Sequence, residues 1–173
     1  DTDGVNNIIP LNDLPDRDGF DDGVFVPMIL PHCVPTTFTY TVTIAAPILN
    51  QPLYVNAWFD WDRNGDWDGV MVCGQNQAPE WAVQNQVLPA GLPAGTYQFQ
   101  TPAFLPWHPP TGEEPSPIWM RITLAEQPWQ PTGTSLPGYG GSGPANGYQY
   151  GETEDYYFTP IVDVTPPDVI GAV

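Results

Sequence analysis

The sequence predicts an all-β protein, an antiparallel β-sandwich of the jelly-roll or immunoglobulin-like kind with long Pro/Gly-rich loops. First, 23 Pro and 17 Gly in 173 residues leave little room for long helices. Second, about seven short segments rich in β-branched and aromatic residues are separated by turn residues. Third, 41% of the residues are hydrophobic and 13% aromatic, which is enough to fill one core and excludes a disordered chain.

The predicted strands follow one another through the region 24–164, which we expect to form one β-sandwich domain. The clearest is 36–46, where large apolar residues such as Tyr40 and Val42 alternate with Thr, because this period of two is typical of a half-buried strand. The expected strands are 23–30, 36–46, 52–61, 81–87, 96–100, 118–125 and 155–164.

The remaining segments connect or flank these strands. Residues 1–23 are an acidic leader rich in turn-forming residues, and residues 165–173 are a Pro-Pro hinge with a short apolar tail. The connections 101–117 and 127–150 exceed ordinary loop length, so we expect them to carry function or to cover the sheets.

The charge balance excludes several classes of function. Twenty Asp and Glu face only three Arg and no Lys, which gives a formal net charge of -17. Nucleic acid is therefore excluded as a partner, because phosphate binding requires clustered basic residues. The self-repulsion of so many carboxylates calls for bound cations. No apolar run reaches 18 residues, so no membrane-spanning segment is expected.

Two cysteines, Cys33 and Cys73, lie 40 residues apart. One structural disulfide in an oxidising compartment fits this spacing better than a redox or zinc site, and two buried free thiols are the alternative. The chain begins at Asp1 without a charged and apolar leader, as a processed exported protein would. We therefore expect an extracellular or cell-surface location.

The string from residue 60 to residue 68 predicts a calcium site. Oxygen-bearing side chains occupy alternating positions, and Gly65 stands sixth, where a loop wrapping a hard cation turns sharply. The predicted ligands are Asp60, Asp62, Asn64, Asp66 and Asp68. Met71 stands twelfth, where an EF-hand has its bidentate Glu, so the last carboxylate must come from elsewhere. The alternative is a solvated acidic turn.

Two further acidic strings are candidate ligands. Glu152, Glu154 and Asp155 precede a hydrophobic segment, and we expect them to complete the site of the 60–68 loop around one calcium ion. Replacing Asp62 or Glu154 by Ala is then expected to abolish calcium binding. A second ion, with turn formation as an equal alternative, is predicted at a cluster in the leader, Asp16, Asp18, Asp21 and Asp22.

Four motifs in this order resemble the GEVED domain of secreted and surface bacterial proteins, over about residues 20 to 162. They are D-D-G-V at 21–24, W-F-D-W-D-R-N-G-D-W at 58–67, M-R-I at 120–122 and G-E-T-E-D-Y at 151–156. Thr153 stands where the name-giving motif has Val. The resemblance implies a β-sandwich module of exported proteins without catalytic activity. Arg121 either pairs with one of the motif carboxylates or lies on the surface.

Catalytic motifs are poorly represented. Both histidines adjoin proline, and neither a G-x-S-x-G nor an H-E-x-x-H string occurs. A carboxylate pair for glycoside hydrolysis is the remaining catalytic alternative, because several Glu stay unassigned. They are Glu80, Glu113, Glu114 and Glu126.

We therefore expect a non-enzymatic, calcium-stabilised extracellular structural module or subunit. It would self-associate into a surface filament by adding residues 169–173 or 5–14 as a strand to a neighbouring subunit. The alternatives are an accessory domain of a larger secreted protein and a carbohydrate-binding or adhesive module. A carbohydrate-binding module would stack glycans on aromatic residues of the long loops. For these aromatics we favour the other role, packing that anchors the loops. These aromatics are Trp107, Trp119, Trp129, Tyr139, Tyr148 and Tyr150.

Overall fold

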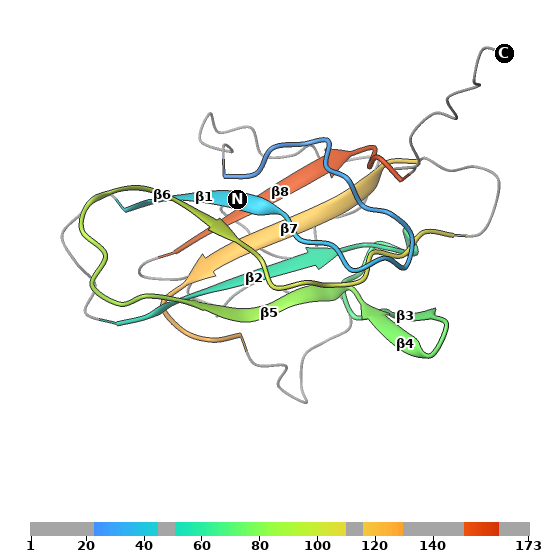
Figure 1. Ribbon diagram of the computed structural model, residues 1–173, viewed down its shortest axis with the longest axis horizontal. Coiled ribbons are helices and arrows are strands. Elements are labelled where there is room, and N and C mark those ends of the chain that lie inside the picture. The colour runs from blue at the N-terminus through green and yellow to red at the C-terminus, as the bar shows by residue number, and fades with distance from the viewer. Residues whose placement is uncertain (1–22, 45–50, 110–115, 130–150, 163–173) are drawn as a thin grey trace, which may run out of the picture.

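The computed structural model describes residues 23–44, 51–109, 116–129 and 151–162 (Figure 1). These residues form eight strands and no helix, so no helix among them could cross a membrane. The strands are β1 (Thr39–Ile44), β2 (Leu53–Phe59), β3 (Val70–Cys73), β4 (Asn76–Pro79), β5 (Trp81–Leu88), β6 (Gly95–Gln100), β7 (Ile118–Ala125) and β8 (Gly151–Phe158). The prediction of an all-β protein is confirmed.

The strands form two layers and a projecting hairpin. One layer is an antiparallel four-stranded sheet in the order β5-β2-β7-β8, and the other is the antiparallel pair β1-β6. Figure 1 shows β1 and β6 crossing in front of the four-stranded sheet. The third sheet is the hairpin β3-β4, which extends from one end of the molecule.

The core lies between the two layers. Tyr40 and Val42 of β1 belong to the same buried cluster as Val55 and Phe59 of β2 and Met120 of β7. Because side chains alternate along a strand, each sheet turns one apolar face toward the other, as the sandwich prediction requires. Burial of each large apolar side chain contributes about 1.5–3 kcal/mol to folding.

The outer face of the four-stranded sheet carries a second apolar cluster. Trp58 and Trp119, from neighbouring strands, are buried there together with Trp67 from the loop after β2. Trp81 stacks on Trp58 with ring centroids 5.9 Å apart, and Trp129 meets the same indole edge-on. The loop after β2 is therefore packed against this face.

Three expectations about the strands need correction. Residues 23–30 make only isolated bridges, at Val24 and Ile29, because Pro27 interrupts the segment and lacks the N–H that a ladder needs. The hairpin β3-β4 was not predicted, although β3 is a run of four apolar residues and Gly74, with φ of 64°, stands in the turn before β4. The last strand spans Gly151–Phe158 where 155–164 was expected, so the acidic string lies inside β8.

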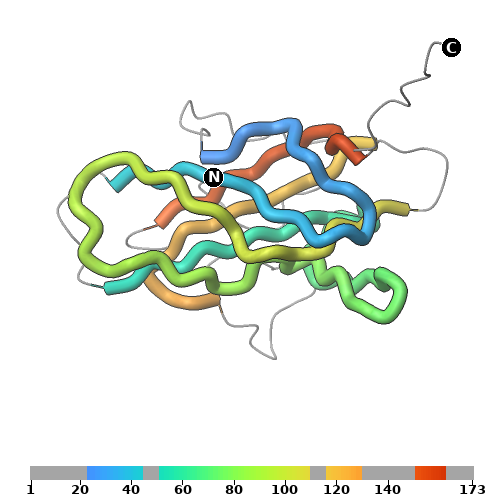
Figure 2. Tube along the Cα trace, viewed as in Figure 1, coloured from blue at the N-terminus to red at the C-terminus, as the bar shows by residue number. Residues whose placement is uncertain are grey.

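The predicted disulfide is present and joins Cys33 to Cys73. Cys33 follows the segment 23–30, drawn in blue in Figure 2, and its N–H donates to the carbonyl of Pro106 at 2.8 Å. Cys73 ends β3. The bond therefore ties the projecting hairpin to the body of the protein.

Candidate metal centre

The acidic loop begins where β2 ends, and Asp60 organises its first turn. Asp60 is buried, and its carboxylate accepts hydrogen bonds from the N–H groups of Asn64 at 3.0 Å and Gly65 at 3.3 Å. Arg63 and Gly65 adopt left-handed backbone conformations, with φ of 61° and 87°. Glycine tolerates this conformation at no steric cost, which explains its place at the sixth position of the loop.

The other predicted ligands repeat one local interaction along the loop. The side chain of Asp62 accepts a hydrogen bond from the N–H of Asn64, Asn64 accepts from Asp66, and Asp66 accepts from Asp68, over 2.9–3.3 Å. Each oxygen-bearing side chain thus accepts from the backbone two residues later. These Asx-type bonds hold the side chains in place without using all their oxygen lone pairs.

A residue to which no role was assigned from the sequence, Glu80, completes the group. Glu80 is fully buried between β4 and β5, and its carboxylate accepts hydrogen bonds from the N–H groups of Trp61 at 3.0 Å and Gly69 at 2.8 Å. A Cβ atom on Gly69 would stand 2.8 Å from that carboxylate. The close approach of Glu80 to the loop therefore depends on glycine at position 69.

The hairpin explains why Glu80 escaped prediction. Gly69 and Glu80 flank β3-β4, and the N–H of Glu80 donates to the carbonyl of Gly69 at 2.9 Å. The ten residues between them form an excursion that returns to its starting point. Glu80 therefore lies next to Gly69 at the end of the acidic loop, although it is eleven residues further along the chain. By sequence alone, the twelfth position of the loop is Met71. The sequence signal that could have pointed to Glu80 was a glutamate closely following a glycine turn, Gly74.

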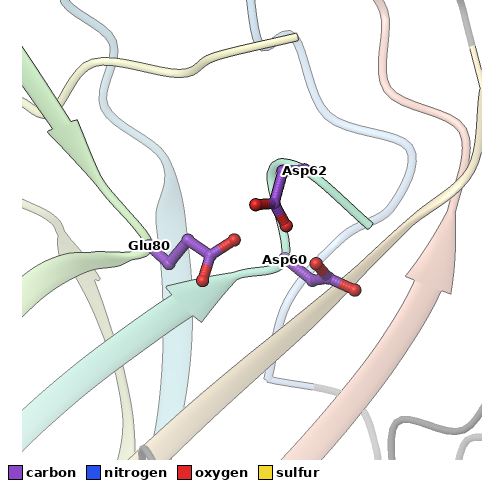
Figure 3. A group of neighbouring side chains, drawn as sticks. All are labelled: Asp60, Asp62 and Glu80. Atoms are coloured by element: carbon purple, nitrogen blue, oxygen red, sulfur yellow. The ribbon is translucent and has the colours of Figure 1, made fainter. Parts of the chain in front are cut away.

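Asp60, Asp62 and Glu80 bring one carboxylate oxygen each within 4.8 Å of one another. Figure 3 shows the carboxylates of Asp62 and Glu80 facing each other beside the end of β2, where Asp60 follows. Within the described ranges, no other group of three or more acidic, His or Cys side chains is so close. Each carboxylate has about four lone-pair positions, so acceptance of two N–H groups leaves room for a cation.

The electrostatics of the group favour a cation. The pKa of Glu80 is raised to about 8, mainly by burial and in part by the nearby charges of Asp60, Asp62 and Asp66, while the hydrogen bond from Gly69 lowers it. Burial likewise raises the pKa of Asp60 to about 6, with a smaller contribution from the charge of Asp62. The pKa of Asp68 is raised by its hydrogen bond with Asp66 and by partial burial. A bound cation would reverse this mutual repulsion.

The structure does not bring Glu152, Glu154 and Asp155 into this group. β7 lies between β2 and β8 in the sheet: its Arg121 pairs with Trp58 of β2 on one side and with Asp155 of β8 on the other. The backbone of β8 is therefore about 10 Å from that of β2. Alternation along β8 also sends neighbouring residues to opposite faces: Asp155 to the outer face and Glu154 to the inner one. The expectation that both strings surround one ion is not supported by this arrangement.

Asp155 instead forms a buried ion pair with Arg121. The guanidinium donates through Nε at 2.7 Å and through Nη2 at 2.5 Å, and the two side chains are 0% and 5% exposed. The carbon atom of the guanidinium lies 5.7 Å from the ring centroid of Trp67, within reach of a cation–π interaction. Of the two alternatives for Arg121, pairing is therefore observed, and the pair supports the acidic loop through Trp67.

Arg63 attaches the same loop to the residues just before β7. Its guanidinium donates to the carbonyl groups of Pro117 at 3.1 Å and Ser116 at 3.2 Å, just before β7. Two of the three arginines of the chain thus hold the acidic loop in position.

Several predicted residues have other surroundings or lie outside the described residues. Trp119 is 3% exposed, and Trp107 and Trp129 pack against buried clusters, which agrees with the packing role. The leader carboxylates Asp16, Asp18, Asp21 and Asp22 lie outside the described residues, as do Tyr139, Tyr148 and Tyr150 and the tail 165–173.

Comparison with known proteins gives one match. The family model described as the GEVED domain matches residues 54–159, from β2 to just beyond β8. The match includes the acidic loop, Glu80, Arg121 and the G-E-T-E-D-Y string. No curated protein and no solved structure matches the chain.

Proposed function

The chain belongs to the GEVED domain family, and we propose from this premise that it is a non-enzymatic structural module of the cell exterior, stabilised by calcium. The observation that carries the proposal is the group Asp60, Asp62 and Glu80, whose carboxylate oxygens lie within 4.8 Å of one another. Two of these side chains are buried, and four backbone N–H groups hold the three in place through five hydrogen bonds.

Calcium suits this set of donors better than other metals. The group offers only oxygen atoms, which hard cations prefer, and contains neither His nor Cys, which zinc and copper favour. Calcium takes six to eight oxygen ligands in flexible geometry. Asn64 and Asp66, together with water, are available to supply the remainder. Magnesium would demand a nearly ideal octahedron, which an irregular loop supplies less readily.

The ion would act by joining separate parts of the fold. Asp60 and Asp62 belong to the loop after β2, whereas Glu80 connects the hairpin to β5. An ion held by all three binds the folded state and not the unfolded chain. It therefore stabilises the protein by about 2.7 kcal/mol when calcium exceeds its dissociation constant a hundredfold.

Two observations support an extracellular, non-catalytic role. The disulfide Cys33–Cys73 favours an oxidising compartment. The histidines are used in packing near it: His108 is 3% exposed with Nε2 2.7 Å from the carbonyl oxygen of Leu30, and His32 accepts the N–H of His108.

Self-association by strand addition is the finer part of the proposal. Within the described residues, β6 pairs only with β1 and β8 pairs only with β7, so each sheet keeps an edge to which a strand from another copy could add. Electron microscopy of the protein with millimolar calcium and after chelation tests this. Ordered filaments would support strand addition, and single particles under both conditions would contradict it.

Isothermal titration calorimetry tests the calcium site. Native protein should bind calcium with saturation, and Asp62→Ala and Glu80→Gln should each lose that binding. Glu126→Gln is the matched control, because it removes a carboxylate that follows β7 and belongs to neither acidic string. Unchanged binding in both Asp62→Ala and Glu80→Gln would refute the site.

A further inference from the structure

A second acidic site lies between the sheets, away from the candidate calcium site. A cavity of about 70 Å³ separates β1 from β7 and β8. This is several times the space that one water molecule needs. Its walls combine aliphatic side chains with threonines: Val42, Val55, Ile122 and Leu124, and Thr41, Thr43 and Thr123. Glu152 and Glu154 also line it, and these are the first two carboxylates of the string in β8.

Glu154 is held in place by a chain of hydrogen bonds. The hydroxyl of Tyr156 donates to its carboxylate, and the N–H of Val24 donates to the oxygen of Tyr156 at 3.1 Å. Gly23 adjoins the same group, since a Cβ atom there would stand 2.9 Å from Glu154 Oε2. Glu154 is only 9% exposed, so an acidic side chain is fixed in the wall of the cavity.

The hydroxyl of Tyr40 supplies an independent sign of a ligand. Tyr40 lines the cavity and is 2% exposed, and its hydroxyl is buried without a hydrogen-bond partner. Burial raises the pKa of this phenol, so the group stays neutral and can both donate and accept. A buried hydroxyl without a partner costs about 1–3 kcal/mol, which a bound N–H donor would offset.

We propose that this cavity binds an organic cation, a guanidinium or alkylammonium group on an aliphatic stem. The stem lies along Val42, Val55 and Ile122, and the charged head meets Glu152, Glu154 and the hydroxyl of Tyr40. Side chains of the Arg and Lys type combine these two parts. A hard metal ion accounts less well for the aliphatic part of the lining, which offers it no ligand.

The cation has two sources that share this chemistry. The chain contains three Arg and no Lys, and the structure uses Arg63 and Arg121 at the acidic loop. Arg17, the third, precedes Gly23 by six residues, which extended chain spans in about 20 Å. The alternative source is a free cation or a basic side chain of another molecule.

A double-mutant cycle in excess calcium tests Arg17 as the source. Arg17→Gln and Glu154→Gln should each lower Tm by about 3 °C, and the double variant should lower it no further than either single variant. Gln keeps the shape of Glu154 and its hydrogen bond from Tyr156 while removing the charge. Tyr40→Phe is a second variant that retains the packing of the ring. It should lower Tm if its hydroxyl accepts from the cation, and should leave Tm unchanged or raise it if the hydroxyl is unbonded.

Additive effects of Arg17→Gln and Glu154→Gln would point to the outside source. Calorimetry with butylguanidinium chloride and with spermidine should then show saturable binding that Glu154→Gln reduces at least tenfold. Additive effects, a Tyr40→Phe variant that is not destabilised, and no binding of either probe would together overturn the proposal. Calcium titrations of the same variants keep the two sites apart, because loss of this site should leave calcium binding at Asp60, Asp62 and Glu80 intact.

Discussion

Two of the acidic strings of this chain, 60–68 and 152–155, lie in different environments. The loop after β2 turns its carboxylates toward one point, where Asp60 and Asp62 meet Glu80. The string in β8 is distributed to both faces of a sheet, with Asp155 in an ion pair and Glu154 at a cavity. A loop with left-handed residues can converge on an ion, whereas a strand must alternate. The conformation of the backbone therefore decides which acidic side chains can meet at one point.

The largest expected effect on stability comes from the acidic string in β8. Arg121→Met leaves Asp155 as a buried unpaired charge, which should lower the free energy of unfolding by about 3–5 kcal/mol in urea denaturation. The double variant Arg121→Met/Asp155→Leu should recover most of the loss, because no buried charge remains. A single variant within 1 kcal/mol of the native protein would contradict the structural role of the pair.

The disulfide is expected to affect the acidic loop after β2 and its metal site. Replacing Cys33 and Cys73 by Ser removes a link between residues 40 apart, which should cost about 3–4 kcal/mol by chain entropy. Because Cys73 belongs to the hairpin that returns the chain to Glu80, calcium affinity measured by calorimetry should also fall. Unchanged affinity would show that the hairpin holds Glu80 without the disulfide.

Removal of calcium by a chelator tests which of the two acidic strings binds the ion. With calcium a hundredfold above its dissociation constant, EDTA should lower the stability by about 2.7 kcal/mol and Tm by roughly 5–10 °C. Asp62→Ala should abolish this difference between the two conditions, and Glu154→Gln should preserve it. A difference that vanishes in Glu154→Gln would show that the two strings share one ion after all.

The pH dependence of calcium binding sharpens the role of Glu80. The ion-free fold raises the pKa of Glu80 from its ordinary value of 4.5 to about 8, so folding favours the protonated acid. The stability of the ion-free protein should therefore fall as the pH rises from 4.5 to 8. Calcium must displace that proton, so its affinity should weaken about tenfold between pH 7 and pH 6. In Glu80→Gln, scanning calorimetry with EDTA should show a smaller dependence on pH.

The smallest expected effect concerns the hydrogen-bond chain at Glu154. Tyr156→Phe removes the bond to Glu154 and the acceptor for the N–H of Val24, which should cost about 1–2 kcal/mol. Calcium affinity should not change, because this hydroxyl lies on the inner face of the sheet with Glu154. Thermal denaturation and calcium titration of the same sample check both statements, and a loss of calcium affinity would contradict the separation.

Much of the fold could be predicted from the sequence. Period-two alternation identified β1, dense apolar segments identified β2 and β7, and abundant proline and glycine excluded long helices. These are local properties of the sequence. The acidic loop and the role of Gly65 could be predicted for the same reason, because the ligand spacing and the turn depend on consecutive residues. The segment 23–30 was misjudged, since its apolar composition suggested a strand that Pro27 interrupts.

What only the tertiary structure decided was which distant residues meet. Sequence spacing placed Met71 at the twelfth position of the loop, and the hairpin brought Glu80 there instead. The register of β7 against β8 set Asp155 opposite Arg121, and alternation turned Glu154 toward β1. The sequence by itself determined most of the strands and the place of the acidic loop. Strand register and hairpin closure are non-local, and they determined which carboxylates meet at one point and which are kept apart.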